Sequence, residues 1–132
     1  MADEKNIVRR GLISAVYPER HSARVTFEDK DNVVSAELPI LTSYASKNCL
    51  YHLPDIAEQV ICLYEESDAQ EGDGVIIGSI YSDVNKPKVS SQDKFRLDFE
   101  GGSFIEFDRS TGDLNINCKG NIFVNGKNIF LN

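Results

Sequence analysis

Apolar and polar residues alternate in five short segments of the first 82 residues. Ala23, Val25 and Phe27 alternate with polar neighbours, which is the pattern of a strand that buries one face. The same pattern predicts strands over 7–17, 22–27, 33–38, 60–64 and 75–81. Gly11 lies inside the first segment, and a bulge or a strong bend is expected near it.

Polar or irregular stretches connect these segments. Turns are predicted at 17–20, which contains Pro18, and at 29–32. Residues 39–54 form a looser stretch with one short helical turn expected around 42–45, and residues 65–73 form an acidic loop. Five short strands with a long connection after the third are typical of a small Greek-key barrel. The sequence therefore predicts a flexible N-terminus over 1–6 and a five-stranded OB-type barrel over 7–82.

The pattern changes after residue 82. Residues 83–92 are mostly polar, contain Pro87, and indicate a linker or neck. From 93 to 132, short alternating segments are separated by glycine-containing turns. The chain ends in a near-repeat, because residues 121–125 (NIFVN) and 128–132 (NIFLN) are offset by seven positions. Self-similarity of this kind predicts a stacked β-structure in which each segment is covered by its neighbours.

Residues 93–132 are not expected to be stable as one chain. No helix is predicted to cover their apolar positions, and a thin ribbon of strands leaves its edges unpaired. Three copies wound about a common axis remove both problems, because the alternating apolar positions then point to a shared core. The sequence thus predicts an all-β chain ending in an intertwined trimeric β-helix. The trimer core is predicted to comprise nine residues: Ile105, Phe107, Leu114, Ile116, Cys118, Ile122, Val124, Ile129 and Leu131.

Two registers are open for the last two segments. In the first, the β-branched residues point inward, and Phe123 and Phe130 lie on the surface. The opposite register buries the two phenylalanines together with Asn121 and Asn128. The first is favoured, because a core of β-branched and leucine residues leaves no buried amide to satisfy.

The composition is that of an ordinary globular protein, with 41% apolar and 27% charged residues, and not that of a disordered one. The net charge of −7 opposes a nucleic-acid-binding surface, which is normally basic. The sequence has no run of 18 apolar residues and no apolar segment of a signal peptide near its start. We expect a protein that is made and folded in a cytoplasm.

Candidate chemistry is sparse. The three cysteines form no C-x-x-C pair, and Cys62 and Cys118 lie in apolar strand patterns, so buried free thiols are expected there. His21 and His52 lie in a turn and a loop without a nucleophile motif, so no catalytic residue is predicted. The acidic residues of 65–73 lack the ordered spacing of a calcium loop, and no helix follows the glycines of the tail. No metal or cofactor site is predicted.

Three stretches carry a resemblance to a known family. Residues 53–60 (LPDIAEQV), followed by 74–82 (GVIIGSIYS), resemble the barrel of the phage baseplate assembly protein V family. The motif of that family is Pro-x-x-Gly-Glu-x-Val, an acidic loop and Gly-x-x-x-Gly-x-x-Tyr, and Ala57 stands where it has its first glycine. Residues 93–108 (DKFRLDFEGGSFIEFD) are similar to the start of the family's β-helix. The likeness extends over nearly the whole chain, from about residue 8 to residue 132.

This family forms the central spike of contractile tails, and related spikes occur in R-type bacteriocins and type VI secretion. The resemblance implies a non-enzymatic homotrimer, a component of a phage tail or tail-like particle made in a bacterial cytoplasm. Its barrels would attach to the tail tube or baseplate hub, and its β-helix would pierce the target cell envelope. Whether the particle is a phage, a bacteriocin or another device stays open.

The tip of the spike is expected to hold no metal. Some long spikes of the family carry a His-x-His pair that binds iron near the tip, but this chain has no histidine after His52. The tip would then be held by its apolar core, or capped by a separate small protein.

Two other functions are open as alternatives. An OB-type barrel can bind single-stranded nucleic acid or another ligand, but that mode uses basic grooves and stacking aromatic residues, and the charge of −7 opposes it. A wall-degrading enzyme would need a lysozyme domain, for which the chain has no space between Tyr81 and Asp93.

Overall fold

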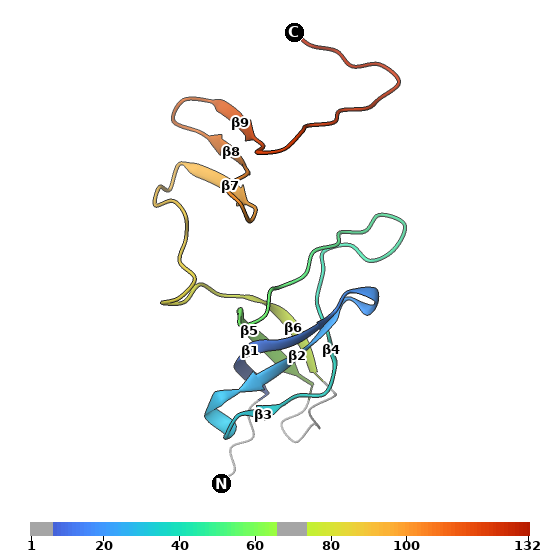
Figure 1. Ribbon diagram of the computed structural model, residues 1–132, viewed down its shortest axis with the longest axis vertical. Helices are drawn as coiled ribbons and strands as arrows, with labels where there is room; N and C mark the ends of the chain where they lie inside the picture. Colours follow the sequence, from blue (N-terminus) through green and yellow to red (C-terminus); the bar gives the residue numbers. More distant parts are fainter. Residues whose placement is uncertain (1–6, 66–73) are drawn as a thin grey trace. The chain divides into compact units, whose positions relative to one another are not determined.

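The computed structural model of the protein describes residues 7–65 and 74–132. The chain divides into two compact units, Met1–Lys86 and Pro87–Asn132 (Figure 1). The boundary falls inside the stretch 83–92 that the sequence indicates as a neck. Both units are built from strands, and the described helical turns are two short 3-10 segments, Pro18–Arg20 and Glu28–Lys30. The all-β prediction is therefore confirmed.

The N-terminal unit contains one antiparallel sheet in the order β3-β2-β1-β5-β6, with β4 paired to β2. Its strands are β1 (Val8–Tyr17), β2 (Ser22–Phe27), β3 (Val33–Val34), β4 (Leu38–Pro39), β5 (Gln59–Tyr64) and β6 (Gly74–Ser79) (Figure 1). The predicted strand positions agree with these bounds to within one or two residues, except over 33–38.

The core of this unit follows the alternation in the sequence. Every second residue of β2 and β5 is buried, and the remaining members come from β1, β4, β6 and residue 40. The full set is Ile13, Ala23, Val25, Phe27, Leu38, Ile40, Val60, Cys62, Tyr64 and Ile76. The prediction of a buried free thiol is confirmed for Cys62, which is 0% exposed.

The strand predicted over 33–38 is divided into β3 and β4 by Ser35. The Ser35 hydroxyl accepts a hydrogen bond from the Val25 amide at 3.0 Å, and the Ser35 amide donates to the Val25 carbonyl at 2.8 Å. A side chain thus replaces the backbone acceptor that a regular ladder would supply. Ser35 is fully buried between the two short strands.

Within the described part of the N-terminal unit, the paired strands do not close into the continuous barrel that the sequence predicts. One isolated parallel bridge joins Ile40 to Ile76, and the Leu41 amide donates to the Ile76 carbonyl at 2.8 Å. Beyond this point residues 41–43 and 52–54 diverge from β6, leaving an open groove of about 550 Å³. The sheet is therefore open along this side, apart from the single bridge.

Of two local predictions in this unit, one is wrong and one is confirmed. Residues 42–45 form no helical turn, because Thr42 and Leu50 lie on the two arms of a loop in which the Thr42 hydroxyl donates to the Leu50 carbonyl at 2.8 Å. The bulge predicted near Gly11 is confirmed and lies between Ile13 and Ala15. Gly11 is needed for close packing, since an added Cβ would lie 2.6 Å from the Thr26 carbonyl oxygen. Most of the acidic loop, 66–73, is outside the described residues.

The C-terminal unit is a three-stranded antiparallel sheet in the order β7-β8-β9, formed by β7 (Lys94–Asp98), β8 (Phe104–Asp108) and β9 (Asp113–Asn117). Gly101 and Gly102 make the first turn with φ of 92° and 97°, a backbone conformation that favours glycine. Residues 118–132 continue without regular secondary structure (Figure 1). Among the described residues, no helix is long and apolar enough to cross a membrane.

Candidate self-association face of the C-terminal unit

The strand register of β7, β8 and β9 gathers apolar side chains on one side of the sheet. Directly paired residues on neighbouring strands point to the same side. Two cross-strand rows result, Phe95–Phe107–Leu114 and Leu97–Ile105–Ile116. We call these six residues the apolar face.

The apolar face is uncovered in the single chain. Its side chains are exposed by between 39% at Ile105 and 81% at Phe95. A contiguous exposed apolar area on a sheet is the usual mark of a protein–protein contact or of an aggregation site. Because β7 and β9 are both edge strands, the backbone groups along their outer sides are also available for pairing with another chain.

The opposite side of the sheet is polar, and its charged side chains form ion pairs with one another within the chain. Arg96 Nη1 lies 2.8 Å from Oε1 of Glu106, and Arg96 Nη2 lies 2.9 Å from Oδ1 of Asp98. The guanidinium also lies 3.8 Å from the centroid of the Phe104 ring, and Lys94 Nζ is 3.5 Å from Glu106. The hydrogen bond to Asp98, followed in size by the one to Glu106, raises the pKa of Arg96. Glu106 is 6% exposed, and among the described residues no buried polar side-chain atom lacks a partner.

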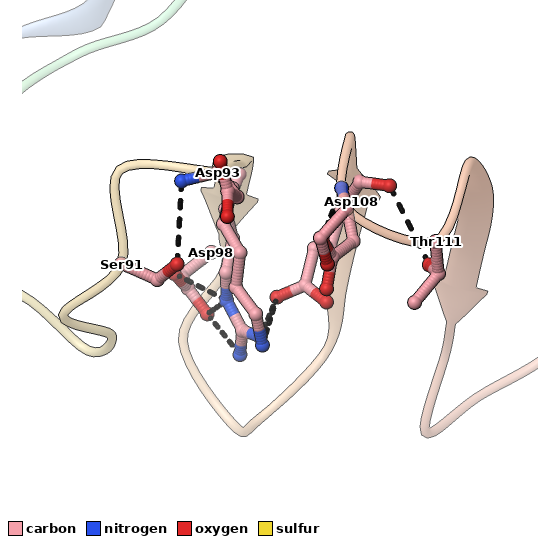
Figure 2. Close-up of polar contacts among 9 residues, drawn as sticks. Ser91, Asp93, Asp98, Asp108 and Thr111 are labelled. Atoms are coloured by element: carbon pink, nitrogen blue, oxygen red, sulfur yellow. Dashed lines mark hydrogen bonds and ion pairs between the residues drawn. The ribbon is translucent and has the colours of Figure 1, made fainter.

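Polar contacts also fix the edges of the sheet. Asp108 accepts hydrogen bonds at Oδ1 from the Ser110 amide at 2.9 Å and from the Ser110 hydroxyl at 2.6 Å, and these bonds lower the pKa of Asp108. Its carbonyl oxygen accepts the Gly112 amide at 2.7 Å and the Thr111 hydroxyl at 3.5 Å (Figure 2). Arg109 Nε lies 2.7 Å from Oδ1 of Asp93 and ties the end of β8 to the start of β7. The register that builds the apolar face is thus held by the polar contacts.

Residues 118–132 extend the exposed apolar sequence beyond the sheet. In the described chain no backbone–backbone hydrogen bond involves residues 119–132. The Lys119 amide donates to the Ser103 hydroxyl at 2.9 Å, and the Asn121 carbonyl accepts the Cys118 thiol at 3.6 Å. All large apolar side chains of this segment are exposed by more than half, namely Ile122, Phe123, Val124, Ile129, Phe130 and Leu131. Most of this exposed backbone is therefore open to pairing with another chain, which would also cover the apolar side chains.

The structure brings together four of the nine predicted core residues, Ile105, Phe107, Leu114 and Ile116, on the apolar face. The other five, Cys118, Ile122, Val124, Ile129 and Leu131, lie on residues 118–132, outside the three strands, and are exposed in the single chain. The prediction of a buried thiol at Cys118 is not met in the single chain, where Cys118 is exposed like every residue of β9 before it.

Sequence reasoning left Phe95 and Leu97 out of the core. Their alternation was visible, but only the pairing of β7 with β8 assigns them to the same side as Ile105 and Phe107. The signal that would have found them is the alternation itself, applied to every strand of the tail.

The histidines of the N-terminal unit have structural contacts. His21 Nδ1 lies 3.2 Å from the Ile40 carbonyl oxygen, and His21 Nε2 lies 2.9 Å from that of His52. These contacts connect the turn before β2 to the loop 41–53. Among the described residues, no three His, Cys, Asp or Glu side chains are placed to hold a metal ion.

No protein-family model matches the sequence, and no curated protein matches it. Function is therefore inferred from the residues and contacts described above.

Proposed function

We propose that this chain is a non-enzymatic structural protein that acts as a homotrimer: the central spike of a contractile tail or injection device. The apolar face of β7–β9, followed by the unpaired apolar residues 118–132, is the observation that carries this proposal. The polar side of the small sheet forms its ion pairs within the same chain, whereas the apolar face stays exposed in the described chain. The missing cover is assigned to two further copies of the same chain.

Self-association would cover the apolar face of the C-terminal unit and pair the open edges of its sheet. Full burial of one leucine, isoleucine or phenylalanine side chain contributes about 1.5–3 kcal/mol, so covering the exposed part of the six side chains offsets the cost of association. The open edges of β7 and β9 can pair with neighbouring copies, and closing the sheets around an axis removes the edges. A threefold arrangement then gives an intertwined β-helix with the nine predicted residues, Phe95 and Leu97 in its core.

The N-terminal unit is assigned the role of an OB-type collar that attaches to the tail tube or hub. The bridge between Ile40 and Ile76 supports this, since a five-stranded barrel closes where its third segment meets its last. Ala57 has a φ of 73°, which suits the glycine that the family motif has at that place. An added Cβ on Gly74 would lie 2.7 Å from the Tyr64 ring, so the first glycine of the second motif is required for packing.

In this assignment the β-helix is the part that enters the target cell envelope, and the particle is a phage tail or a related device. The work is mechanical, so no catalytic residue is invoked. Within residues 118–132, the exposed Phe130 offers a contact for a small capping protein.

The solution mass of the purified chain tests the proposal. We expect a particle of about 44 kDa, three times the 14.7 kDa chain. The variant Ile116→Asp should dissociate it, because it buries three like charges about one axis. Asn117→Asp is the matched control, since it adds the same charge to the neighbouring position on the polar side, opposite Phe104 and not opposite the Glu106 carboxylate. A wild-type particle of 15 kDa at micromolar concentration, or a trimer that survives Ile116→Asp, contradicts the proposal.

A further inference from the structure

Asn125 is followed by Gly126 at the junction of the two near-repeats. No other asparagine in the sequence precedes a glycine; the comparable residues Asn121 and Asn128 each precede isoleucine. In the described chain both Asn125 and Gly126 are exposed, and neither takes part in a strand or a backbone hydrogen bond.

The fold does not require a glycine at position 126. Its φ lies outside the positive range, unlike that of Gly101 or Gly112. An added Cβ would lie 3.5 Å from the Asn128 carbonyl oxygen and 3.8 Å from Ile129 Cγ1, which are ordinary van der Waals contacts. The consequence of glycine at this position is therefore chemical: the preceding asparagine faces a backbone nitrogen that no side chain hinders.

We propose that Asn125 is a deamidation site of the unassembled chain, and that assembly protects it. The Gly126 nitrogen gives its proton to solvent and attacks Cγ of Asn125, forming a C–N bond. The side-chain amide leaves as ammonia, and a five-membered succinimide remains. Water then opens the ring at either carbonyl and gives aspartate or isoaspartate. Asparagine and water are consumed, aspartate and ammonia are formed, and no oxidant or reductant is needed.

The protection by assembly rests on the proposed function. Ring closure requires Asn125 Cγ to approach the Gly126 nitrogen, which a free, extended segment allows. If residues 121–125 and 128–132 pair with neighbouring copies, the backbone is held on both sides of Gly126. The Gly126 nitrogen then cannot rotate toward Asn125 Cγ.

Deamidation would mark copies that fail to assemble. Each event adds one negative charge per chain at the edge of the apolar core, and isoaspartate also lengthens the backbone by one carbon. Three such changes at one level of a threefold core oppose pairing. An aged, unassembled chain would thus lose its ability to join a spike.

The experiment compares the wild-type protein with Ile116→Asp, both incubated in mildly alkaline buffer at physiological temperature. Cleavage after lysine releases residues 120–127, which contain both Asn121 and Asn125. Mass spectrometry with separation of isoaspartate then follows the two amides in one peptide. We expect loss of the Asn125 amide in Ile116→Asp, retention of Asn121, and retention of both amides in the wild-type trimer.

The double variant Ile116→Asp/Gly126→Ala is the matched control, because the added methyl group hinders ring closure while its contacts are ordinary. Loss of the Asn125 amide should slow strongly in it. An intact Asn125 in Ile116→Asp, or equal loss with alanine at 126, overturns the site, and the trimer mass still stands as separate support for the spike. Equal loss in a wild-type protein of 44 kDa overturns the protection. If the wild type has a mass of 15 kDa and loses the amide, the spike assignment fails and the site remains.

Discussion

Arg96 and Glu106 face each other across β7 and β8, with 2.8 Å between Arg96 Nη1 and Glu106 Oε1. Their positions on the directly paired strands place both side chains on the side of the sheet opposite Leu97 and Ile105. Phe104 covers the guanidinium, so the polar side is complete within one chain. The asymmetry between the two sides of this sheet is the basis of the trimer proposal.

Replacing Glu106 by glutamine should destabilise the C-terminal unit. The amide cannot neutralise Arg96 and Lys94, which both contact the carboxylate, and it leaves two cations close together. Thermal unfolding of the full protein should show a lower melting temperature. The same replacement at Glu100, an exposed residue of the β7–β8 turn, is the control and should change little. Equal melting temperatures for Glu106→Gln and wild type would show that the ion pair is not needed.

Ala57→Gly should stabilise the N-terminal unit by about 1 kcal/mol, since an L-residue in the left-handed region costs about 1–2 kcal/mol and glycine does not. Ala57 has a φ of 73° and donates its amide to the Ile13 carbonyl at 2.8 Å, a bond that glycine retains. Denaturant unfolding measures the change. Ala45→Gly, at a position without positive φ, should be neutral or destabilising. A destabilised Ala57→Gly variant would show that the backbone at Ala57 is not strained.

Thiol counting distinguishes the single chain from the trimer. Burial raises the pKa of Cys62 to about 12, against a smaller opposing effect of Arg9, so its thiol stays protonated and inaccessible at about pH 8. Cys49 is exposed and should react with an aromatic disulfide reagent at once. Cys118 is exposed in the single chain and should be protected in the trimer. We expect one fast thiol per chain in the native protein and two in Ile116→Asp; two in a native trimer would place Cys118 outside its core.

Acid should weaken the β8–β9 turn. Hydrogen bonds from Ser110 lower the pKa of Asp108 in the folded protein, so their stabilisation is present above the pKa of the unfolded chain and is lost as the pH falls through the lower folded value. Asp108→Asn keeps an acceptor oxygen for Ser110 and removes the titration. Melting temperatures measured from neutral to acidic pH should therefore fall less in Asp108→Asn than in wild type. Parallel curves would contradict the role of the Asp108 carboxylate.

The register of the last two segments is tested by a pair of neighbouring variants. Ile122→Asp should dissociate the trimer, and Phe123→Asp should leave its mass unchanged, because only the first residue points to the proposed axis. Light scattering measures the particle mass of both variants. The reverse result would establish the opposite register, in which Phe123 and Phe130 are buried.

The sequence by itself determined which residues alternate, because the period of a strand is local. Ala23, Val25 and Phe27, like Val60, Cys62 and Tyr64, needed no knowledge of their neighbours to be recognised as one buried face. The same local pattern identified Ile105, Phe107, Leu114 and Ile116 in the tail, and the turn glycines between them.

The tertiary structure alone decided which strands pair, and in which register. Ser35 interrupts a strand by bonding to Val25, ten residues away in the sequence, and Leu97 joins Ile105 and Ile116 only once three strands are aligned. Glutamate is a residue type normally found on the surface, yet Glu106 is buried because Arg96 and Lys94 lie beside it on the neighbouring strand. Such contacts join residues distant along the chain, and their energies depend on register, which a one-dimensional pattern does not specify.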